Sequence, residues 1–265
     1  LDNLLCLLWV FSLHCFLEGH QMPERFRIIA LTMAAVFICY IDRVVISLTI
    51  IPMGAELGWN NTEKGIVLGS FYLAYMVTQI YGGILSDRIG AKIVLGVGLI
   101  TWSLFTLVTP LAAAAGFTIL ILARLGMGLG EGVTFPRGTV FMLDGSQGRA
   151  LKIRCRDEQR HTAGTIFGLV VTPIIITKLS WQWAFYLYGA VGFVWYYFWS
   201  KHVTSSPAAS TTISKEELTY IADNAPATGP GEDLSWRIWL FNRPLWAIAV
   251  AHFCNNYTLF VILSW

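Results

Sequence analysis

The amino-acid sequence predicts an all-α protein that crosses a membrane several times. Hydrophobic residues make up 55% of the 265 residues and charged residues only 13%, whereas soluble domains carry about 25% charged residues. Four stretches contain no Asp, Glu, Lys or Arg: residues 65–86, 93–123, 179–200 and 244–265. Each is longer than the roughly 18 residues that a helix needs to cross the hydrocarbon core.

The first 21 residues stand apart from the predicted helices. Their apolar run, residues 4–17, lacks the positively charged start and the small-residue cleavage site of a signal peptide, and it is short for a span. The first methionine is Met22. We therefore treat residues 1–21 as a non-native leader and begin the fold at residue 22.

Apolar runs between turn signals predict the membrane helices in order. The capping-box pattern of Asn60 and Glu63 marks the start of the second helix, and aromatic residues at both ends of the sixth fit interfacial belts. A Ser-, Thr-, Pro- and acid-rich stretch predicts a linker over residues 201–243. The predicted helices are 28–53, 63–85, 92–111, 117–140, 162–179 and 182–200, which form a six-helix bundle over residues 22–200, and 244–265, a seventh transmembrane helix.

Lys and Arg are distributed unequally between the predicted loops, and this sets the orientation. Fourteen of them fall on one side of the membrane and two, Lys64 and Lys178, on the other. Cytoplasmic loops carry such an excess. We therefore expect a multi-pass protein of the plasma (inner) membrane, with a cytoplasmic N-terminus and linker. A net charge of +2 without a basic patch that carries interleaved aromatic residues excludes nucleic acid as a partner.

Glycines recur at four-residue spacing in two predicted helices. The pairs are Gly126 with Gly130, Gly128 with Gly132, and Gly164 with Gly168. In a bilayer this spacing lets two helix backbones approach closely. Chance in a glycine-rich chain is the alternative, and in either case the pattern concerns packing rather than chemistry.

Four charged residues fall inside predicted spans, where a charge costs at least about 2.5–3.5 kcal/mol. Asp42 and Arg43 are adjacent in the first span, and Arg124 and Glu131 lie within about 20° of the same face of the fourth. Without a bound substrate, these two acids and two bases together carry almost no net charge. An added carboxylate would favour an unpaired arginine and a protonated acid, which is the basis of proton-coupled anion binding. Two permanent ion pairs that hold the helices together are the alternative, although buried pairs stabilise poorly.

Further polar residues accompany these charges. Tyr40 precedes Asp42 by two residues, and Tyr75 and Gln79 share a face of the second span. Tyr75 and Gln79 either hydrogen-bond a polyol substrate or form polar contacts between helices. Binding and packing are equal alternatives for a polar cluster in the seventh span: His252, Asn255, Asn256 and Tyr257. The five cysteines show no metal-ligand spacing, and we expect no metal and no cofactor.

The loop between the second and third spans carries a family signature. Its residues match the pattern G-x-x-x-D-R-x-G-x-K/R at Gly83, Asp87, Arg88, Gly90 and Lys92. The chain therefore resembles the major facilitator superfamily. The resemblance implies a monomer with twelve spans, of which this chain covers seven. It also implies that this loop is a cytoplasmic latch, in which the acid contacts a neighbouring helix and whose opening permits the inward-facing state.

Within the superfamily, the chain is most similar to the anion:cation symporters, which include bacterial sugar-acid transporters and animal vesicular glutamate, sialic acid and phosphate carriers. Residues 40–43, 124–136 and 251–257 carry this likeness. It implies that Arg43 holds the substrate carboxylate, that Asp42 and Glu131 couple transport to protons, and that Arg124 pairs with these acids. Residues 137–161 depart from the family pattern, so we expect a short or distorted fifth helix.

The predicted function is proton-coupled symport of a small organic anion, with a sugar acid such as galactonate, glucarate or a hexuronate as substrate. Na⁺ is the alternative coupling ion. The predicted substrate-binding residues are Tyr40, Arg43, Tyr75, Gln79, Arg124, Asn255 and Asn256. A receptor or sensor that binds without translocation, or a defunct fragment of the same fold, is the competing class, and the latch motif favours transport. An enzyme is not expected, because no zinc spacing or nucleophile motif occurs.

Overall fold

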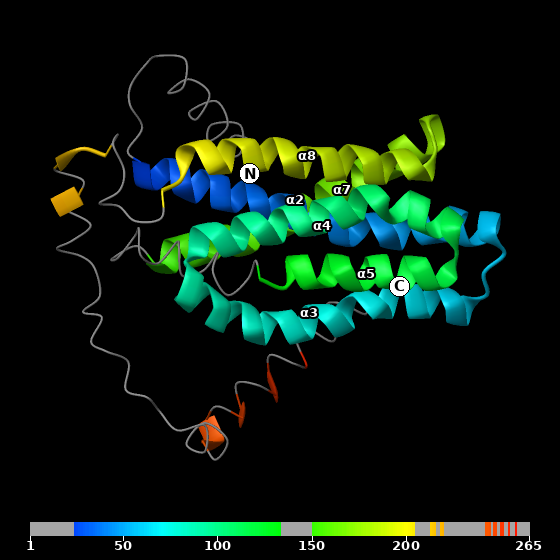
Figure 1. The fold of residues 1–265 in the computed structure, drawn as a ribbon, viewed down its shortest axis with the longest axis horizontal. Coiled ribbons are helices and arrows are strands. Elements are labelled where there is room, and N and C mark those ends of the chain that lie inside the picture. Colours follow the sequence, from blue (N-terminus) through cyan, green and yellow to red (C-terminus); the bar gives the residue numbers. More distant parts are fainter. Residues whose placement is uncertain are drawn as a thin grey trace.

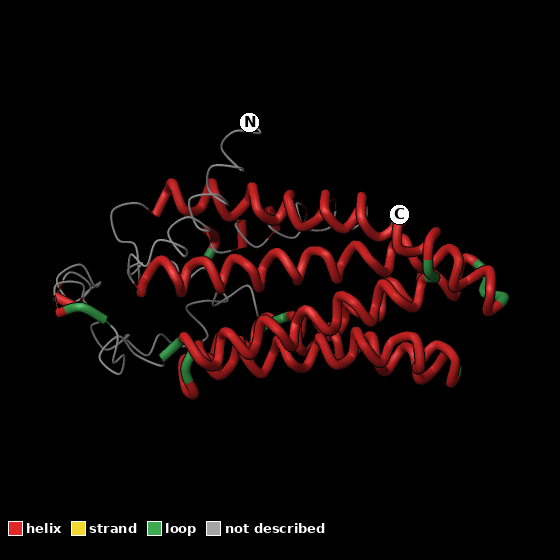
Figure 2. Tube along the Cα trace, turned by 90° about the horizontal axis from the view of Figure 1, so that it is seen from above, coloured by secondary structure: helices red, strands yellow, loops and turns green. Residues whose placement is uncertain are grey.

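The described part of the chain is a bundle of six helices (Figure 1). The structure is a computed structural model, and it describes residues 24–133, 150–204, 213–215, 218–219, 242–244, 246–247, 250–251, 254 and 258. The helices are α2 (Glu24–Leu57), α3 (Asn61–Ile89), α4 (Ala91–Ala115), α5 (Phe117–Glu131), α7 (Ala150–Lys178) and α8 (Trp181–His202). Figure 2, turned by 90°, shows that these helices run side by side along the long axis of the bundle.

The all-α architecture and the six helices of the predicted bundle are confirmed, but two of their ends differ from the predicted ones by more than four residues. Helix α5 ends at Glu131 rather than at residue 140, and Gly132 and Val133 form a turn, where glycine weakens a helix by about 1 kcal/mol. Helix α7 begins at Ala150 rather than at residue 162, so the expectation of a short fifth helix was wrong. Apolar periodicity could not detect this extension, because most of the added residues are polar or charged.

The seventh predicted span, residues 244–265, lies mostly outside the described residues. The few residues described between Arg243 and Thr258 are helical. The same holds for the predicted linker, residues 201–243, of which only short pieces are described. The division of the chain into bundle, linker and seventh span therefore stays a prediction.

A capping box and a single glycine set the two turns of α3. The side-chain Oδ1 of Asn60 accepts a hydrogen bond from the Glu63 N–H at 2.9 Å, and the Asn60 N–H donates to the Glu63 carboxylate at 2.8 Å. The predicted capping box is thus confirmed. At the other end, Gly90 alone separates α3 from α4. Its φ of 92° lies in a region that side chains with a Cβ avoid.

Glycines let α5 approach two neighbours closely. A Cβ atom at Gly128 would overlap the carbonyl oxygen of Phe71 on α3, and one at Gly130 would come within 2.6 Å of the Trp102 backbone nitrogen on α4. At a different helix interface, Gly164 of α7 lies against the backbone of α2. The predicted close packing of helix backbones is therefore confirmed for both glycine-rich helices.

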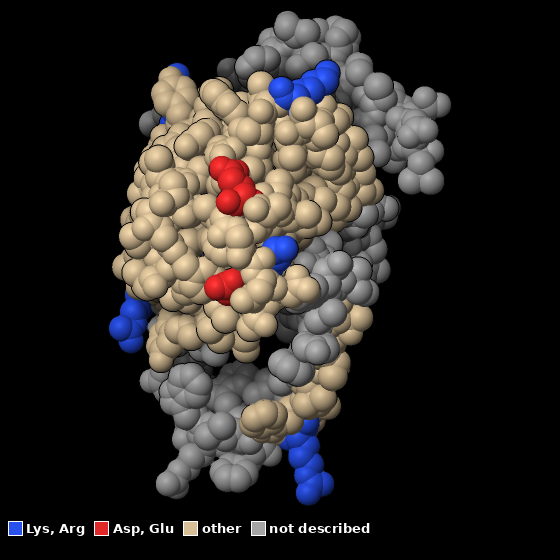
Figure 3. Space-filling view, turned by 90° about the vertical axis from the view of Figure 1, so that its right-hand side faces the viewer, with Lys and Arg blue, Asp and Glu red and all other residues tan. Residues whose placement is uncertain are grey.

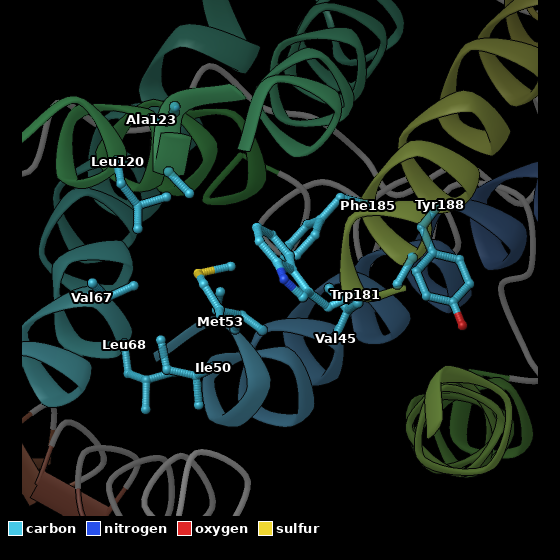
Figure 4. Packing of buried hydrophobic residues seen from close by; sticks show 14 of the residues in the cluster. Val45, Ile50, Met53, Val67, Leu68, Leu120, Ala123, Trp181, Phe185 and Tyr188 are labelled. Atoms are coloured by element: carbon cyan, nitrogen blue, oxygen red, sulfur yellow. The ribbon is translucent and has the colours of Figure 1, made fainter. Parts of the chain in front are cut away.

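Two apolar clusters fill the bundle, and they meet near the middle of α2. The first cluster (Figure 4) includes Met53, Trp181 and Phe185. The second includes Trp102 and Trp199. Along α2 the second cluster ends at Cys39 and the first begins at Ile41. The residues that follow directly on α2 are the adjacent acid and base predicted from the sequence, so the fold places them at mid-depth.

The outer faces of the helices are apolar. Five large hydrophobic side chains are at least 60% exposed: Ile51, Leu73, Tyr81, Leu111 and Leu122. Soluble proteins rarely show such extensive apolar surfaces. Two helical stretches, Arg27–Leu57 and Ala91–Ala115, are long and apolar enough to cross a membrane. The end of the bundle at which α2 meets α3 shows only a few charged groups on a largely uncharged surface (Figure 3).

Candidate functional site

Four charged side chains meet in the middle of the bundle. Asp42 and Arg43 come from α2, Arg124 and Glu131 come from α5, and each is at most 5% exposed. They are the only fully buried charged residues among the side chains that the structure describes. Each of the two helices supplies one acid and one base, so the four formal charges cancel.

Arg43 and Glu131 form an ion pair between α2 and α5. The Nε of Arg43 donates a hydrogen bond to Oε1 of Glu131, and the Cys39 thiol donates to the same oxygen at 2.8 Å. The guanidinium carbon of Arg43 lies 5.3 Å from the ring centre of Tyr40 and 4.6 Å from that of Tyr75, within range of cation–π attraction. Arg43 is thus held both by a carboxylate and by aromatic faces.

Arg124 has no carboxylate partner within the part of the chain that the structure describes. Its Nη1 lies 3.0 Å from the sulfur of Met127, a weak acceptor, and its Nε has no hydrogen-bond partner. The ring centre of Phe71 is 5.1 Å from its guanidinium carbon. Among the described residues Arg124 forms no ion pair with an acid, although Glu131 and Asp42 act on it electrostatically. Glu131 is about 10 Å further along the same helix, and it pairs with Arg43 on α2 instead.

Asp42 is completely buried, and neither of its carboxylate oxygens has a hydrogen-bond partner among the described residues. Trp102, Glu131 and Arg124 are close enough to act on it electrostatically. The indole Nε1 of Trp102 also lacks a hydrogen bond of normal geometry. An ionised carboxylate without partners is costly in an apolar interior. The position therefore suits a carboxyl group that exchanges a proton.

Tyr75 and Gln79 lie on α3 and bind to each other. The Gln79 Nε2 donates to the Tyr75 hydroxyl at 3.1 Å. Tyr75 is buried and stacks on Phe71 with ring centres 5.7 Å apart, while Gln79 is half-buried. The hydrogen bond lies within one helix and so does not itself join two helices. A substrate-binding role for the pair stays a prediction.

The signature residues occupy the reversal between α3 and α4. They lie in the last two turns of α3, at the reversal and in the first turn of α4: Gly83, Asp87, Arg88, Gly90 and Lys92. The carbonyl of Lys92 accepts a hydrogen bond from Trp199 Nε1 at 3.1 Å, which ties this turn to α8. The Asp87 side chain lies outside the described part of the chain, so the latch contact stays a prediction.

Two predicted site residues also lie outside the described part: Asn255 and Asn256. The sequence interpretation missed four residues that the structure brings to the site: Cys39, Phe71, Trp102 and Met127. Cys39 precedes Arg43 by four residues and Phe71 precedes Tyr75 by four, a spacing that places such pairs on one helix face. That spacing was the available signal for both.

Comparison with known proteins shows what this arrangement resembles. The sequence model described as Major Facilitator Superfamily matches residues 32–151. The sodium-dependent phosphate transport protein 1, chloroplastic, of Arabidopsis thaliana is 36% identical over 92% of this chain and 48% of its own length. The ascorbate transporter, chloroplastic, of the same plant is 34% identical over 92% of this chain and 46% of its own length. The chain thus spans about half the length of these curated relatives.

The fold is also that of a solved transporter. The inward-facing, unoccupied crystal structure of a bacterial homologue of the human lysosomal transporter Spinster superposes with a TM-score of 0.58. The likeness covers 72% of this chain and 45% of that chain at 18% sequence identity, and so concerns the fold alone. With the family match and the anion-carrier relatives, these findings show that the chain belongs to the major facilitator superfamily of integral membrane transporters.

Proposed function

We propose that this chain forms one half of a secondary transporter that moves a small organic anion across a membrane by alternating access. The observation that carries the proposal is the buried Arg124, which has no carboxylate partner in the described part of the chain and lies near the Arg43–Glu131 ion pair. Asp42 and Glu131 act on Arg124 electrostatically, but a buried cation without a hydrogen-bonded carboxylate is costly, and a bound anion would reduce that cost. Alternating access requires two halves around a midplane site, so the proposal concerns the protein that contains both.

The proposed coupling follows from the competition between two anions for one arginine. While Glu131 is ionised, it occupies Arg43. When a proton neutralises Glu131, the attraction between them weakens and Arg43 becomes available to a substrate carboxylate, to which arginine binds with paired hydrogen bonds. Asp42, buried without hydrogen-bond partners in the described region, is the proposed second proton carrier. Proton and anion would therefore enter the site together.

The proposed substrate is a sugar acid such as galactonate, glucarate or a hexuronate. The two arginines can bind a carboxylate, and Tyr40, Tyr75 and Gln79 supply hydroxyl and amide groups for a polyol. Relatives named for phosphate and for ascorbate make those two anions the competing substrates. H⁺ is the proposed coupling ion, with Na⁺ as the alternative.

The proposed orientation places the ends of the helices that carry Arg27, Arg88, Lys92 and Lys201 in the cytoplasm. These four lie at one end of the bundle, while Lys64 and Lys178 lie at the other. The α3–α4 reversal would then form the cytoplasmic latch. The membrane proposed from the sequence is the plasma (inner) membrane. A chloroplast membrane is the alternative, because the relatives above are named as chloroplastic, and imaging of a tagged protein distinguishes the two.

The test is uptake into proteoliposomes of a two-half protein that carries this sequence as its first half. Labelled galactonate, glucarate, a hexuronate, ascorbate and phosphate are each supplied with and without an inward proton gradient, and with Na⁺ replaced by K⁺. Gradient-stimulated, saturable uptake of a sugar acid supports the proposal. Saturable binding without uptake by a folded protein would instead indicate a receptor of the same fold.

A further inference from the structure

The two oxygens of the Glu131 carboxylate have unequal surroundings. Oε1 accepts hydrogen bonds from Arg43 Nε and from the Cys39 thiol. Oε2 is buried and has no hydrogen-bond partner among the described residues. A carboxylate oxygen that already accepts two donors has little capacity left for a third, whereas Oε2 keeps its lone pairs. The two oxygens therefore differ in their readiness to accept a proton.

Helix α2 fixes the thiol at this position. Cys39 and Arg43 are four residues apart, so they lie one above the other on the face of α2 that meets Glu131. Cys39 is fully buried with no exposed surface. It belongs to the second apolar cluster, which also contains Phe71 and Trp102, and close packing in this cluster leaves the sulfur little freedom to move. The thiol is thus held against Glu131 by packing that does not depend on the charges.

We propose that Cys39 is a positioning residue for Glu131, which orients the carboxylate so that Oε2 is the atom that gains the coupling proton. This inference rests on the proposed function and deepens it. The step takes place in the conformation that opens the site to water: a hydronium ion transfers a proton to Oε2, so one O–H bond of hydronium breaks, one O–H bond forms on Oε2, and a water molecule and a neutral carboxyl group result. Oε1 then keeps the thiol hydrogen bond while its attraction to Arg43 weakens.

Other titratable groups also lie near Glu131, and all of them are present in each of the variants compared below. From α2 these are Asp42, Arg43 and Tyr40, from α3 Tyr75, and from its own helix Arg124. The described residues of α4 near Glu131 supply Trp102, which does not titrate. A difference between variants at Cys39 therefore reports the thiol and not this common background.

The experiment compares Cys39→Ala, Cys39→Ser and Thr49→Val in the two-half protein. The thiol hydrogen bond stabilises the ionised carboxylate, so its loss in Cys39→Ala favours the protonated form. The pH at which gradient-driven uptake is half-maximal should then rise by about half a unit to one unit. Cys39→Ser keeps a donor and should restore the original pH. Thr49 is equally buried on α2 but bonds to carbonyls of its own helix, so Thr49→Val should leave the profile unchanged.

A second readout keeps this inference separate from the proposed function. The carbonyl stretch of protonated Glu131, identified by its loss in Glu131→Gln, can be titrated by infrared spectroscopy without any substrate. The same upward shift in Cys39→Ala and its reversal in Cys39→Ser would support the inference even if no anion were transported. An unshifted band and uptake profile in Cys39→Ala, or equal shifts in all three variants, would overturn it.

Discussion

The surroundings of the two buried arginines differ more than their sequence positions suggest. Both guanidinium groups lie within 6 Å of the ring centre of Phe71. Arg43 forms an ion pair with Glu131. Within the described region Arg124 hydrogen-bonds to a thioether sulfur and faces the Phe71 ring, and the acids Asp42 and Glu131 act on it without forming an ion pair. The positive charge of Arg43 is therefore balanced by an ion pair within the protein, whereas Arg124 is available to pair with a bound anion.

The two arginines can therefore have two different roles in anion binding, which a single arginine could not combine. An arginine that is paired with an acid can bind a substrate anion only after that acid is protonated, whereas an unpaired arginine attracts an anion at all times. A buried unpaired charge lowers stability, because its hydration is lost without a compensating partner. The contrast predicts that loss of either arginine weakens anion binding, whereas stability should fall when Arg43 is removed and stay constant or rise when Arg124 is removed.

The largest effect is expected for Arg43→Ala. Removal of the guanidinium leaves Glu131 buried without a counter-charge, and breaking such a pair costs about 3–5 kcal/mol of stability. Anion binding should fall by about 100-fold or more, since a paired hydrogen bond between two charges is lost. Thermal unfolding in detergent and equilibrium binding of the transported anion are the measurements.

A second variant separates folding from binding at Arg43. Arg43→Ala combined with Glu131→Gln removes both charges and should recover most of the lost stability. Binding should stay absent in this double variant. Binding retained within a few fold in either variant would show that Arg43 does not hold the anion.

The next largest effect is expected for Glu131→Gln. The neutral amide mimics the protonated acid and leaves Arg43 available, so anion exchange across the membrane should persist. Accumulation driven by a proton gradient should be lost, because no proton is gained or released at this position. Uptake with and without the gradient, measured beside counterflow of preloaded anion, tests both parts. Undiminished accumulation would make Glu131 a structural residue.

Arg124→Gln should behave in the opposite sense to Arg43→Ala in stability. It removes a buried charge without breaking an ion pair, so the unfolding temperature should rise or stay constant while anion affinity falls about 10-fold. The measurements are the same thermal unfolding and binding assays. A fall in unfolding temperature comparable to that of Arg43→Ala would contradict the contrast, and would indicate a carboxylate partner for Arg124.

The sequence was sufficient for the helices and for the choice of the four buried charges. Stretches without charged residues that are long enough to cross the membrane identify the spans. Charges inside spans are energetically costly and therefore rare, so the four buried charges could be singled out from the sequence. The partner of Glu131 could not be predicted in the same way. Helical spacing favoured Arg124 on the same face, but the closer Arg43 belongs to another helix, and contacts between helices depend on packing that periodicity does not encode.

The extension of α7 and the role of Cys39 were missed for a similar reason. Most of residues 150–162 are polar or charged, and a search for apolar periodicity stops at the end of the apolar run. A lone cysteine in an apolar run reads as a small hydrophobic residue. It becomes informative only when a carboxylate from a distant helix, Glu131, is found against its sulfur.

The smallest effect is expected for Tyr75→Phe, which tests whether Tyr75 and Gln79 bind the substrate or contribute only to packing. The ring that lies near the Arg43 guanidinium is kept, and so is the ion pair of Arg43 with Glu131. The hydrogen bond of the Tyr75 hydroxyl with Arg43 is lost, so stability should fall by no more than about 1 kcal/mol. The hydroxyl that accepts from Gln79 is lost, and with it one group for a polyol. For a sugar acid the KM should rise about threefold at constant maximal rate, whereas phosphate, which has no polyol chain, should be unaffected. Gln79→Leu, which removes the other member of the pair, should give the same discrimination. A loss of stability in both variants without any change in KM would assign the pair to packing and leave anion recognition to the two arginines.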